Sequence, residues 1–316
     1  MVATPMTRLP FVDGVQLLSL VSWTDAVGVL GDALSGPGDP AVGPPRTAVP
    51  TAHGELLLMP AETGDAVGVK VTSVAPGNPA AGLPRIQAVY VLFDAVTLTP
   101  RLLLDGTGLT TLRTPAVSAV AIRQLAAPDA RRLVVFGSGP QAWGHVHAIR
   151  AVRPVRTVRL VGRDRARAEA LAARLRGEGV DAVVGIADDV RTADIVVCAT
   201  TATQPVFDGA LLAPGACVAA VGSHHPDVRE LDDTVFRRAA RIVVEDRATA
   251  LREAGDVLQA IAAGALTETR LTALAELVAI DPAGIDPAGI SVFKSVGMSW
   301  QDLALVEHAA RVLDQG

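Results

Sequence analysis

The 316-residue chain contains few cysteines and few aromatic residues, and no long apolar run. Its two cysteines, Cys198 and Cys217, lie in apolar stretches without Cys-x-x-Cys or metal-ligand spacing, which excludes a disulfide framework and predicts buried, reduced thiols and no metal site. Aromatic residues make up only 3%, so Ala, Val and Leu must form most of the core. No segment reaches roughly 18 uninterrupted apolar residues, and the N-terminus lacks a signal-peptide pattern, so we expect an unprocessed protein of the cytoplasm with no membrane span.

The chain also lacks a strong excess of charge of either sign. It has 28 basic and 33 acidic side chains, for a net charge of −5, which excludes a broad attraction to nucleic acid or to an anionic membrane. We therefore expect a small molecule as its partner. Among the basic residues only Lys70 and Lys294 are lysines, and all others are arginines.

From residue 133 onward, short apolar segments alternate with helical patterns, which is typical of a parallel sheet with helical crossovers. Helices are predicted at 141–151 and 165–176. The six expected strands are 133–137, 157–162, 181–186, 194–200, 216–222 and 241–246. Six strands with short crossovers predict a doubly wound, Rossmann-type sheet.

The first part of the chain follows a different pattern, because its strands succeed one another with only turns between them. The expected strands are 54–60, 66–74, 86–94 and 100–106. Pro115 at a first-turn position predicts a connecting helix over 114–125. The last segment predicts a strand and a helix, and we expect it to return to the first domain. A tandem DPAGI repeat at 281–290 predicts a loop.

The sequence thus predicts an α/β protein with two domains. Residues 114–297 form the Rossmann domain, and residues 1–113, joined by 298–316, form a smaller α+β domain.

The motif Gly137-x-Gly139-x-x-Ala142 follows the first Rossmann strand and precedes a helix. The first glycine permits a tight turn, the second lets the backbone approach a pyrophosphate, and the small third residue lets helix and strand pack closely. The helix N-terminus would then receive the phosphates of a dinucleotide. The predicted cofactor site also includes the rest of this turn and later strand ends, namely Ser138, Pro140, Gln141, Thr200, Thr201, Val221 and Lys294.

The end of the second Rossmann strand indicates which dinucleotide is bound. Where an NAD site usually offers an acidic residue, this chain has Gly162, followed by Arg163 and Arg165. Guanidinium groups form bidentate bonds to phosphate, so the pattern favours the 2′-phosphate of NADPH. Asp164 could still reach a ribose hydroxyl, which leaves NADH open.

Three cations of the first domain lie in separate segments: Arg46, Lys70 and Arg113. Taken singly, each would be an ordinary surface cation. Lys70 differs because it lies in a strand between Val69 and Val71, so strand alternation would let it face a cleft.

Several motifs, in order along nearly the whole chain, are similar to those of the ornithine cyclodeaminase and mu-crystallin family. They are PPRTAVP, KVTSVAPGNPAAGLPRIQAVYVLFDA, DGTGLTTLRTPAVSA, GSGPQA, VGSHHPDVRELDD, REAGDVL and VFKSVGMSWQDLA. The resemblance implies a homodimer in which the smaller domain binds substrate and dimerises. It also implies that Arg46, Lys70 and Arg113 hold the carboxylate of an amino or imino acid and polarise its reacting centre, with Glu55 near the same site.

The resemblance also separates the activities of this family. Cyclodeaminases carry a G-G-D-C-P-G segment whose aspartate handles the side-chain ammonium, and here His224 occupies that position in Gly222-Ser223-His224-His225-Pro226-Asp227. An imidazole supplies no negative charge for a second ammonium group, so the pattern disfavours ornithine cyclisation, although Asp227 could substitute. The segment VGRD looks more like the branch of NADPH-dependent ketimine reductases.

We therefore expect an NADPH-dependent reductase of cyclic imino acids, such as 1-pyrroline-2-carboxylate or 1-piperideine-2-carboxylate, giving proline or pipecolate. Lys70 and His224 are the candidate acid–base residues. Three alternatives stay open: an ornithine or lysine cyclodeaminase, an amino-acid dehydrogenase, and a binding protein controlled by its cofactor. The ring size of the substrate is not determined by the motifs.

Overall fold

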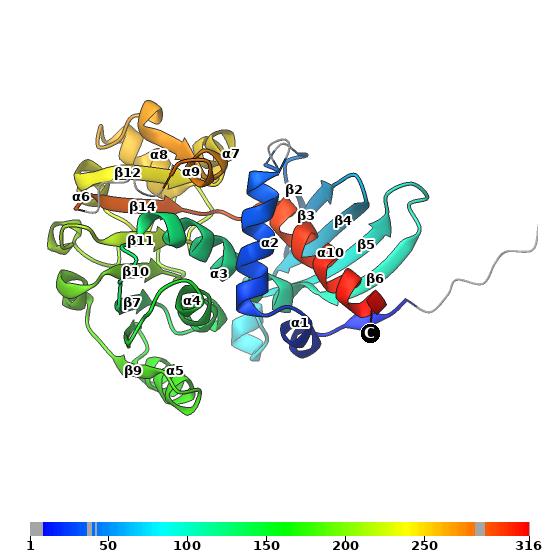
Figure 1. Ribbon diagram of the computed structural model, residues 1–316, viewed down its shortest axis with the longest axis horizontal. Helices are drawn as coiled ribbons and strands as arrows, with labels where there is room; N and C mark the ends of the chain where they lie inside the picture. Colours follow the sequence, from blue (N-terminus) through cyan, green and yellow to red (C-terminus); the bar gives the residue numbers. More distant parts are fainter. Residues whose placement is uncertain (1–8, 37–39, 42, 282–287, 316) are drawn as a thin grey trace, which may run out of the picture. The chain divides into compact units, whose positions relative to one another are not determined.

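The computed structural model describes residues 9–36, 40–41, 43–281 and 288–315. The chain divides into two compact units, each built around one β-sheet (Figure 1). The first unit comprises Met1–Val29, Pro40–Arg113 and Met298–Gly316, and the second comprises Leu30–Asp39 and Thr114–Gly297. Most of the DPAGI repeat lies outside the described residues.

The sheet of the first unit has six strands, of which four form the predicted antiparallel meander. In spatial order they are β1 (Phe11–Val12), β6 (Pro100–Asp105), β5 (Ile86–Asp94), β4 (Ala66–Val74), β3 (Gly54–Glu62) and β2 (Thr47–Thr51). The two outer strands, β1 and β2, are not predicted from the sequence. They are short or fully exposed, so they carry no alternation of buried and exposed residues.

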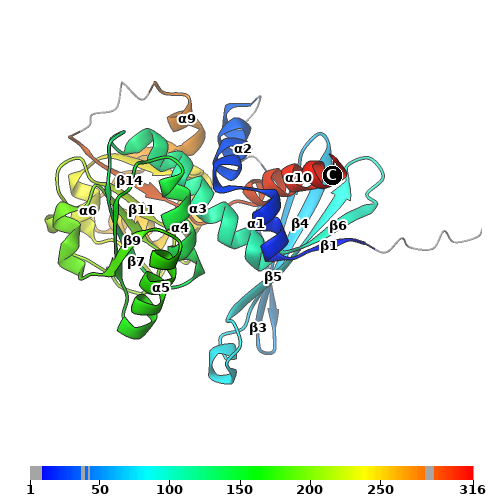
Figure 2. The same cartoon turned by 60° about the horizontal axis from the view of Figure 1, so that its bottom comes forward.

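One face of this sheet is covered by α10 (Ser299–Gln315), which contacts β3 and β4 (Figures 1 and 2). The helix is amphipathic, with Leu303, Val306 and Ala310 among its buried residues. Alternate residues of β4, including Lys70, are buried on their strand. The remaining helical elements of this unit are α1 (Gly14–Leu20), which Asp13 caps, the first part of α2 (Trp23–Ser35), and the 3-10 turn η1 (Asn78–Ala81).

The connecting helix, α3 (Gly106–Leu125), begins earlier than predicted, and the expectation that Pro115 lies in its first turn is wrong. Pro115 lies inside the helix, where it removes one backbone donor. Two glycines at the start of the helix, Gly106 and Gly108, allow neighbouring segments to pack closely against it. A Cβ on Gly106 would lie 2.7 Å from the Cβ of Ala88, and one on Gly108 would lie 2.6 Å from the Cα of Gly14.

The second unit contains a fully parallel sheet of eight strands, which confirms the doubly wound α/β fold. In spatial order the strands are β13 (Leu271–Ala273), β12 (Ala239–Val244), β14 (Ile290–Lys294), β11 (Cys217–Ala220), β10 (Ile195–Cys198), β7 (Arg132–Phe136), β8 (Thr157–Val161) and β9 (Asp181–Val184). The strand predicted in the last segment, β14, lies between β11 and β12 (Figure 1). The short edge strand β13 is not predicted from the sequence.

Helices connect these strands and cover the sheet (Figure 1). They are α4 (Pro140–Arg150), α5 (Arg165–Gly177), α6 (Asp233–Arg238), α7 (Arg247–Glu253), α8 (Gly255–Ala262) and α9 (Leu274–Val278), with 3-10 turns η2 (Ala187–Thr192), η3 (Gly209–Leu211) and η4 (Glu268–Arg270). The core between them is mainly aliphatic, as predicted. Both cysteines are buried free thiols, which confirms the sequence-based expectation.

Within the described part of the chain, no single helix is long and apolar enough to cross a membrane. The helices α1 and α2 reach the required length and composition only as a pair, bent by 75°.

Candidate active site

The glycine-rich turn after β7 has the backbone geometry that the motif predicts. Gly137 has φ +125°, and a Cβ there would lie 2.5 Å from the carbonyl oxygen of Ala199, so only glycine fits. Gly139 is the N-cap of α4, and a Cβ there would meet no atom within 4 Å. Ala142 is fully buried where the helix packs on the strand. The turn therefore leaves open space at a helix N-terminus, which fits a pyrophosphate.

The strand register places several predicted cofactor residues at the carboxyl ends of the parallel strands, which together form one edge of the sheet. Phe136, Cys198, Ala220 and Lys294 are aligned at the carboxyl ends of their strands. Thr200 and Thr201 follow β10, and Val221 follows β11, so all three lie at that edge. The strand order reverses between β7 and β10, and ligands of doubly wound sheets bind at such a switch point.

The residues after β8 are arranged as a solvent-facing group. The side chains of Arg163 and Arg165 are exposed, and Gly162 packs against Ala168, with 3.3 Å from an added Cβ to the Cβ of Ala168. Asp164 is the N-cap of α5 and accepts a hydrogen bond from the backbone N–H of Arg167. One oxygen of the only acidic side chain in this turn is therefore engaged in capping.

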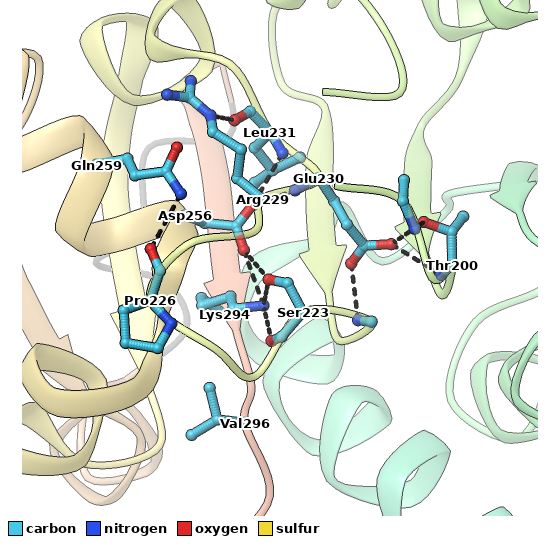
Figure 3. Close-up of polar contacts among 12 residues, drawn as sticks. Thr200, Ser223, Pro226, Arg229, Glu230, Leu231, Asp256, Gln259, Lys294 and Val296 are labelled. Atoms are coloured by element: carbon cyan, nitrogen blue, oxygen red, sulfur yellow. Dashed lines mark hydrogen bonds and ion pairs between the residues drawn. The ribbon is translucent and has the colours of Figure 1, made fainter. Parts of the chain in front are cut away.

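The side chain of Lys294 is directed into the protein at the same edge (Figure 3). It is 1% exposed, and its Nζ donates to the carbonyl oxygen and to Oγ of Ser223, both at 2.7 Å. It also forms an ion pair of 2.9 Å with Asp256, which is itself hydrogen-bonded to Ser223 Oγ. Burial pushes the pKa of Asp256 upward, but the Lys294 charge and these hydrogen bonds outweigh it and lower the pKa. Lys294 thus holds the loop after β11.

Glu230 joins the ends of two neighbouring strands (Figure 3). Its Oε1 accepts from the backbone N–H and the hydroxyl of Thr200, at 2.8 and 2.7 Å, and its Oε2 accepts from the N–H of Gly222 at 2.7 Å. Burial raises the pKa of this carboxyl. Sequence reasoning did not single out Glu230, Asp256 or Ser223, although all three lie in the motifs VGSHHPDVRELDD and REAGDVL.

His224 lies in this anchored loop, directly after Ser223. Its half-buried ring packs against that of His225, with ring centroids 4.4 Å apart. The chain leaving β14 is also held, because Glu245 accepts from the N–H groups of Val296 and Gly297, each at 2.8 Å.

In the first unit, Lys70 is the centre of a buried charged cluster. It is 2% exposed, and its Nζ lies 2.7 Å from Oδ2 of Asp302 on α10 and 3.4 Å from the hydroxyl of Thr110 on α3. Burial lowers the pKa of Lys70 to about 8, and the charges of Arg113 and Arg46 act in the same direction, whereas Asp302 opposes them. Lys70 is thus buried on its strand, as alternation predicts, and its place in a substrate cleft stays a prediction.

Arg113 belongs to the same cluster. Its Nε lies 3.6 Å from Oδ1 of Asp302, and its NH1 donates to Oε1 of Gln301 at 3.2 Å. The charge of Arg46, whose side chain is half-buried, also lowers the pKa of Lys70. Glu55 lies further along β3, opposite Val74, whereas Met59 is the β3 residue opposite Lys70.

This cluster gathers two buried cations, Lys70 and Arg113, and one buried carboxylate, Asp302. Such an arrangement keeps a net positive charge and can bind an anionic group with little competition from water. Asp302 and Gln301 were not singled out from the sequence, although the motif VFKSVGMSWQDLA contains both. Among the described residues, no group of three His, Cys, Asp or Glu side chains is arranged to hold a metal ion.

Comparison with known proteins confirms the family resemblance. The model of the ornithine cyclodeaminase/mu-crystallin family matches residues 24–313. A Δ(1)-pyrroline-2-carboxylate reductase of Bacillus cereus is 36% identical, over 86% of this chain and 87% of the relative. A Δ(1)-pyrroline-2-carboxylate/Δ(1)-piperideine-2-carboxylate reductase of Azospirillum brasilense is 33% identical, over 98% of both chains.

A solved structure is similar over nearly the whole length as well. It is the Δ(1)-pyrroline-2-carboxylate reductase of Thermococcus litoralis in complex with NADH and L-proline. The TM-score is 0.88 at 28% identity, and the match covers 97% of this chain and 98% of the other.

Proposed function

Because the chain belongs to the ornithine cyclodeaminase/mu-crystallin family, we propose that it is a nicotinamide-dependent reductase of cyclic imino acids. The substrates are 1-pyrroline-2-carboxylate or its six-membered homologue, and the products are proline or pipecolate. The similar reductases of Bacillus cereus and Azospirillum brasilense support this substrate class. The structure of the Thermococcus litoralis enzyme with NADH and L-proline supports the cofactor class and the product.

The observation that carries the proposal is the buried cluster of Lys70 and Arg113 beside Asp302. In a dry site, two fixed cations recognise one carboxylate strongly, and Arg113 can offer paired N–H groups to it. A carboxylate held in this way fixes the orientation of the adjacent imine carbon. Most of the catalytic effect therefore comes from orientation, with Arg46 adding positive charge from the preceding segment.

Reduction of a C=N bond requires a hydride at carbon and a proton at nitrogen. With the pyrophosphate of the dinucleotide held at the glycine turn, its reduced nicotinamide would supply the hydride. Lys70, with a pKa near 8, can hold a proton at neutral pH and release it to a nitrogen atom within hydrogen-bond reach. His224 is the second candidate for proton transfer, because the loop that carries it is fixed by Lys294 and Glu230.

We propose NADPH as the preferred cofactor, with NADH as a weaker one. The turn after β8 presents two exposed guanidinium groups, while its aspartate caps α5. This charge pattern favours a 2′-phosphate over a ribose hydroxyl.

We also propose a homodimer formed through the sheet of the first unit. The ends of β3 and β5 extend beyond the part that α10 covers (Figure 2). All residues of β2 are exposed, and Val49, Ile86 and Val89 are exposed apolar side chains on β2 and β5. Light scattering should give twice the monomer mass of 32.5 kDa, and a monomer at micromolar concentration would refute this part of the proposal.

The experiment that tests the activity follows the loss of NADPH or NADH absorbance when each cyclic imino acid is added. We expect rapid oxidation of NADPH, slower oxidation of NADH, and proline or pipecolate as the product. If neither cofactor is oxidised, the proposal fails. Ammonia release from ornithine would then indicate a cyclodeaminase, whereas tight NADPH binding without any turnover would indicate a binding protein.

A further inference from the structure

Each of the two lysines in this chain is buried, and each forms an ion pair with one buried aspartate. Lys294 pairs with Asp256 at 2.9 Å, and Lys70 pairs with Asp302 at 2.7 Å. The first pair holds a loop. The second pair joins the candidate substrate-binding lysine on β4 to the C-terminal helix, α10, and no role follows for Asp302 from the proposed reaction alone.

The surroundings of Lys70 are strongly cationic. Among the described residues, α3 contributes Arg113, the segment before β2 contributes Arg46, and α10 contributes Asp302. On β5 the neighbouring titratable group is Tyr90, the cross-strand partner of Lys70, whose pKa is raised by burial and by the charges of Asp302 and Glu307. Tyr90 is therefore neutral. Asp302 is the carboxylate that balances the cations around Lys70.

The geometry of Asp302 suits a carboxylate that balances the charge of Lys70. Its side chain is 0% exposed, Oδ2 contacts the ammonium of Lys70, and Oδ1 lies 3.6 Å from Arg113 without a hydrogen bond to it. Its charge is thus directed mainly at Lys70. Burial and two guanidinium groups all favour loss of the lysine proton, so only a close negative charge can retain it.

We propose that Asp302 is a positioning residue that keeps the side chain of Lys70 protonated and in place, and so sets the alkaline limit of the reaction. The link to the reaction rests on the proposed function. The effect on the protonation of Lys70 does not, and it can be measured without turnover.

The first measurement is an NMR titration of protein labelled only in its lysine side chains. Lys70 and Lys294 give two signals, and the Lys70→Arg variant identifies them by removing one. We expect Asp302→Asn to lower the titration midpoint of Lys70 by about one to three pH units, because the variant keeps the size of the side chain and removes its charge. An unchanged or higher midpoint overturns the proposal.

Two further variants control this titration. Asp256→Asn removes the buried partner of the other lysine, so it should leave the Lys70 midpoint unchanged. Arg113→Gln removes a neighbouring cation and should raise the midpoint of Lys70. If Asp302→Asn does not fold, Arg113→Gln still tests the electrostatic argument. A lowered or unchanged Lys70 midpoint in Arg113→Gln would contradict that argument.

The second measurement is the pH profile of kcat/KM for imino acid reduction. In Asp302→Asn the alkaline fall should begin at lower pH, with a loss of about fivefold or more at pH 8 and a smaller loss at pH 6. Asp302→Glu keeps the charge and should restore most of the profile.

The same substitution in a Lys70→Arg background separates this role from a purely structural one. Arginine stays charged throughout this pH range, so Asp302→Asn should then cause no shift of the alkaline limit. An equal shift in both backgrounds would overturn the positioning role. If the protein shows no reductase activity at all, the proposed function fails, while the NMR titration still decides the role of Asp302.

Discussion

Lys70 is a buried side chain to which we assign a role in the proposed reaction. Strand alternation puts it on the buried side of β4, where an ammonium group loses its hydration. The ion pair with Asp302 stabilises the charged form of Lys70 only in part. Burial therefore still lowers the pKa of Lys70 to about 8, well below that of an exposed lysine. A group with this pKa changes charge close to neutral pH, as a proton donor should.

We predict that kcat/KM for imine reduction falls as the pH rises through about 8, because Lys70 loses its proton there. Lys70→Ala should lower kcat/KM roughly 10²–10³-fold at neutral pH, since it removes a fixed cation from the site. Lys70→Arg should lower kcat/KM, because the guanidinium does not release its proton, and should abolish the alkaline fall, because it stays charged. Steady-state kinetics from pH 6 to 10 provide the measurement. A wild-type profile that stays flat through pH 8 would refute the assignment.

We propose that the cofactor preference depends on an exposed arginine, Arg163. We predict that Arg163→Ala raises the KM for NADPH by roughly 10- to 100-fold and leaves the KM for NADH nearly unchanged, because a charged hydrogen bond to a phosphate contributes about 1.5–3 kcal/mol. The matched control is Arg167→Ala, which removes an exposed arginine within the first turn of α5. Equal losses with both cofactors would contradict a role in reading the 2′-phosphate.

At the scale of elements, the loop between β11 and α6 is fixed by its surroundings. Lys294 holds Ser223, Glu230 holds Gly222, and both backbone N–H groups of Glu230 and Leu231 donate to Oδ1 of Asp256. Because Asp256 lies in the first turn of α8, a short helix beside the loop determines its path. His224 is thereby held on a rigid segment.

Gly255 at the start of α8 allows this loop to approach. A Cβ there would lie 2.1 Å from the carbonyl oxygen of Val228 and 2.5 Å from that of His225, both backbone atoms that cannot move without shifting the loop. We predict that Gly255→Ala lowers the free energy of unfolding by roughly 1–3 kcal/mol and reduces kcat more than it changes the KM for cofactor.

The control for that substitution is Gly177→Ala in α5, where an added Cβ meets no atom within 4 Å. It should be neutral or stabilising by about 0.5–1 kcal/mol, because alanine favours a helix. Thermal unfolding and kinetics measure both variants. If Gly255→Ala and Gly177→Ala have the same stability and the same kinetics, the loop tolerates the displacement that the added Cβ at residue 255 causes.

At the scale of the whole molecule, the stability should depend on pH through a buried histidine. His145 on α4 lies 2.7 Å from the carbonyl oxygen of Gln141 and 3.0 Å from the hydroxyl of Ser118 on α3. Burial lowers its pKa to about 4, so the folded protein keeps it neutral. Between pH 6.5 and 4 the unfolded chain binds a proton that the folded chain does not, and stability falls as the pH falls.

We predict that this residue alone accounts for a loss of roughly 3 kcal/mol between pH 6.5 and 4. His145→Gln should lose less stability over that interval than the wild type, although it is less stable at pH 7. Denaturant unfolding at several pH values tests this, with the exposed His53→Gln as the matched control. Parallel pH curves for His145→Gln and the wild type would exclude His145 as the cause.

Much of the fold could be predicted from the sequence, because the patterns that specify it are local. The bounds of β4 and β5 agree with their expected ranges, and the Gly137 turn has the predicted conformation. The predicted element bounds were wrong where contacts between distant segments decided the local structure. The helix expected over 114–125 begins at Gly106, and there Gly106 and Gly108 lie against neighbouring segments that leave no room for a Cβ.

The sequence by itself therefore determined much of the secondary structure, the glycine-rich turn and the family. Only the tertiary structure decided which residues surround the two lysines. Asp302 lies 232 positions from Lys70, and Ser223 lies 71 positions from Lys294, so no local pattern joins either pair. The position of β14 between β11 and β12 was decided in the same way. Periodicity specifies which face of an element is buried, whereas the partner on that face is fixed only when distant segments pack together.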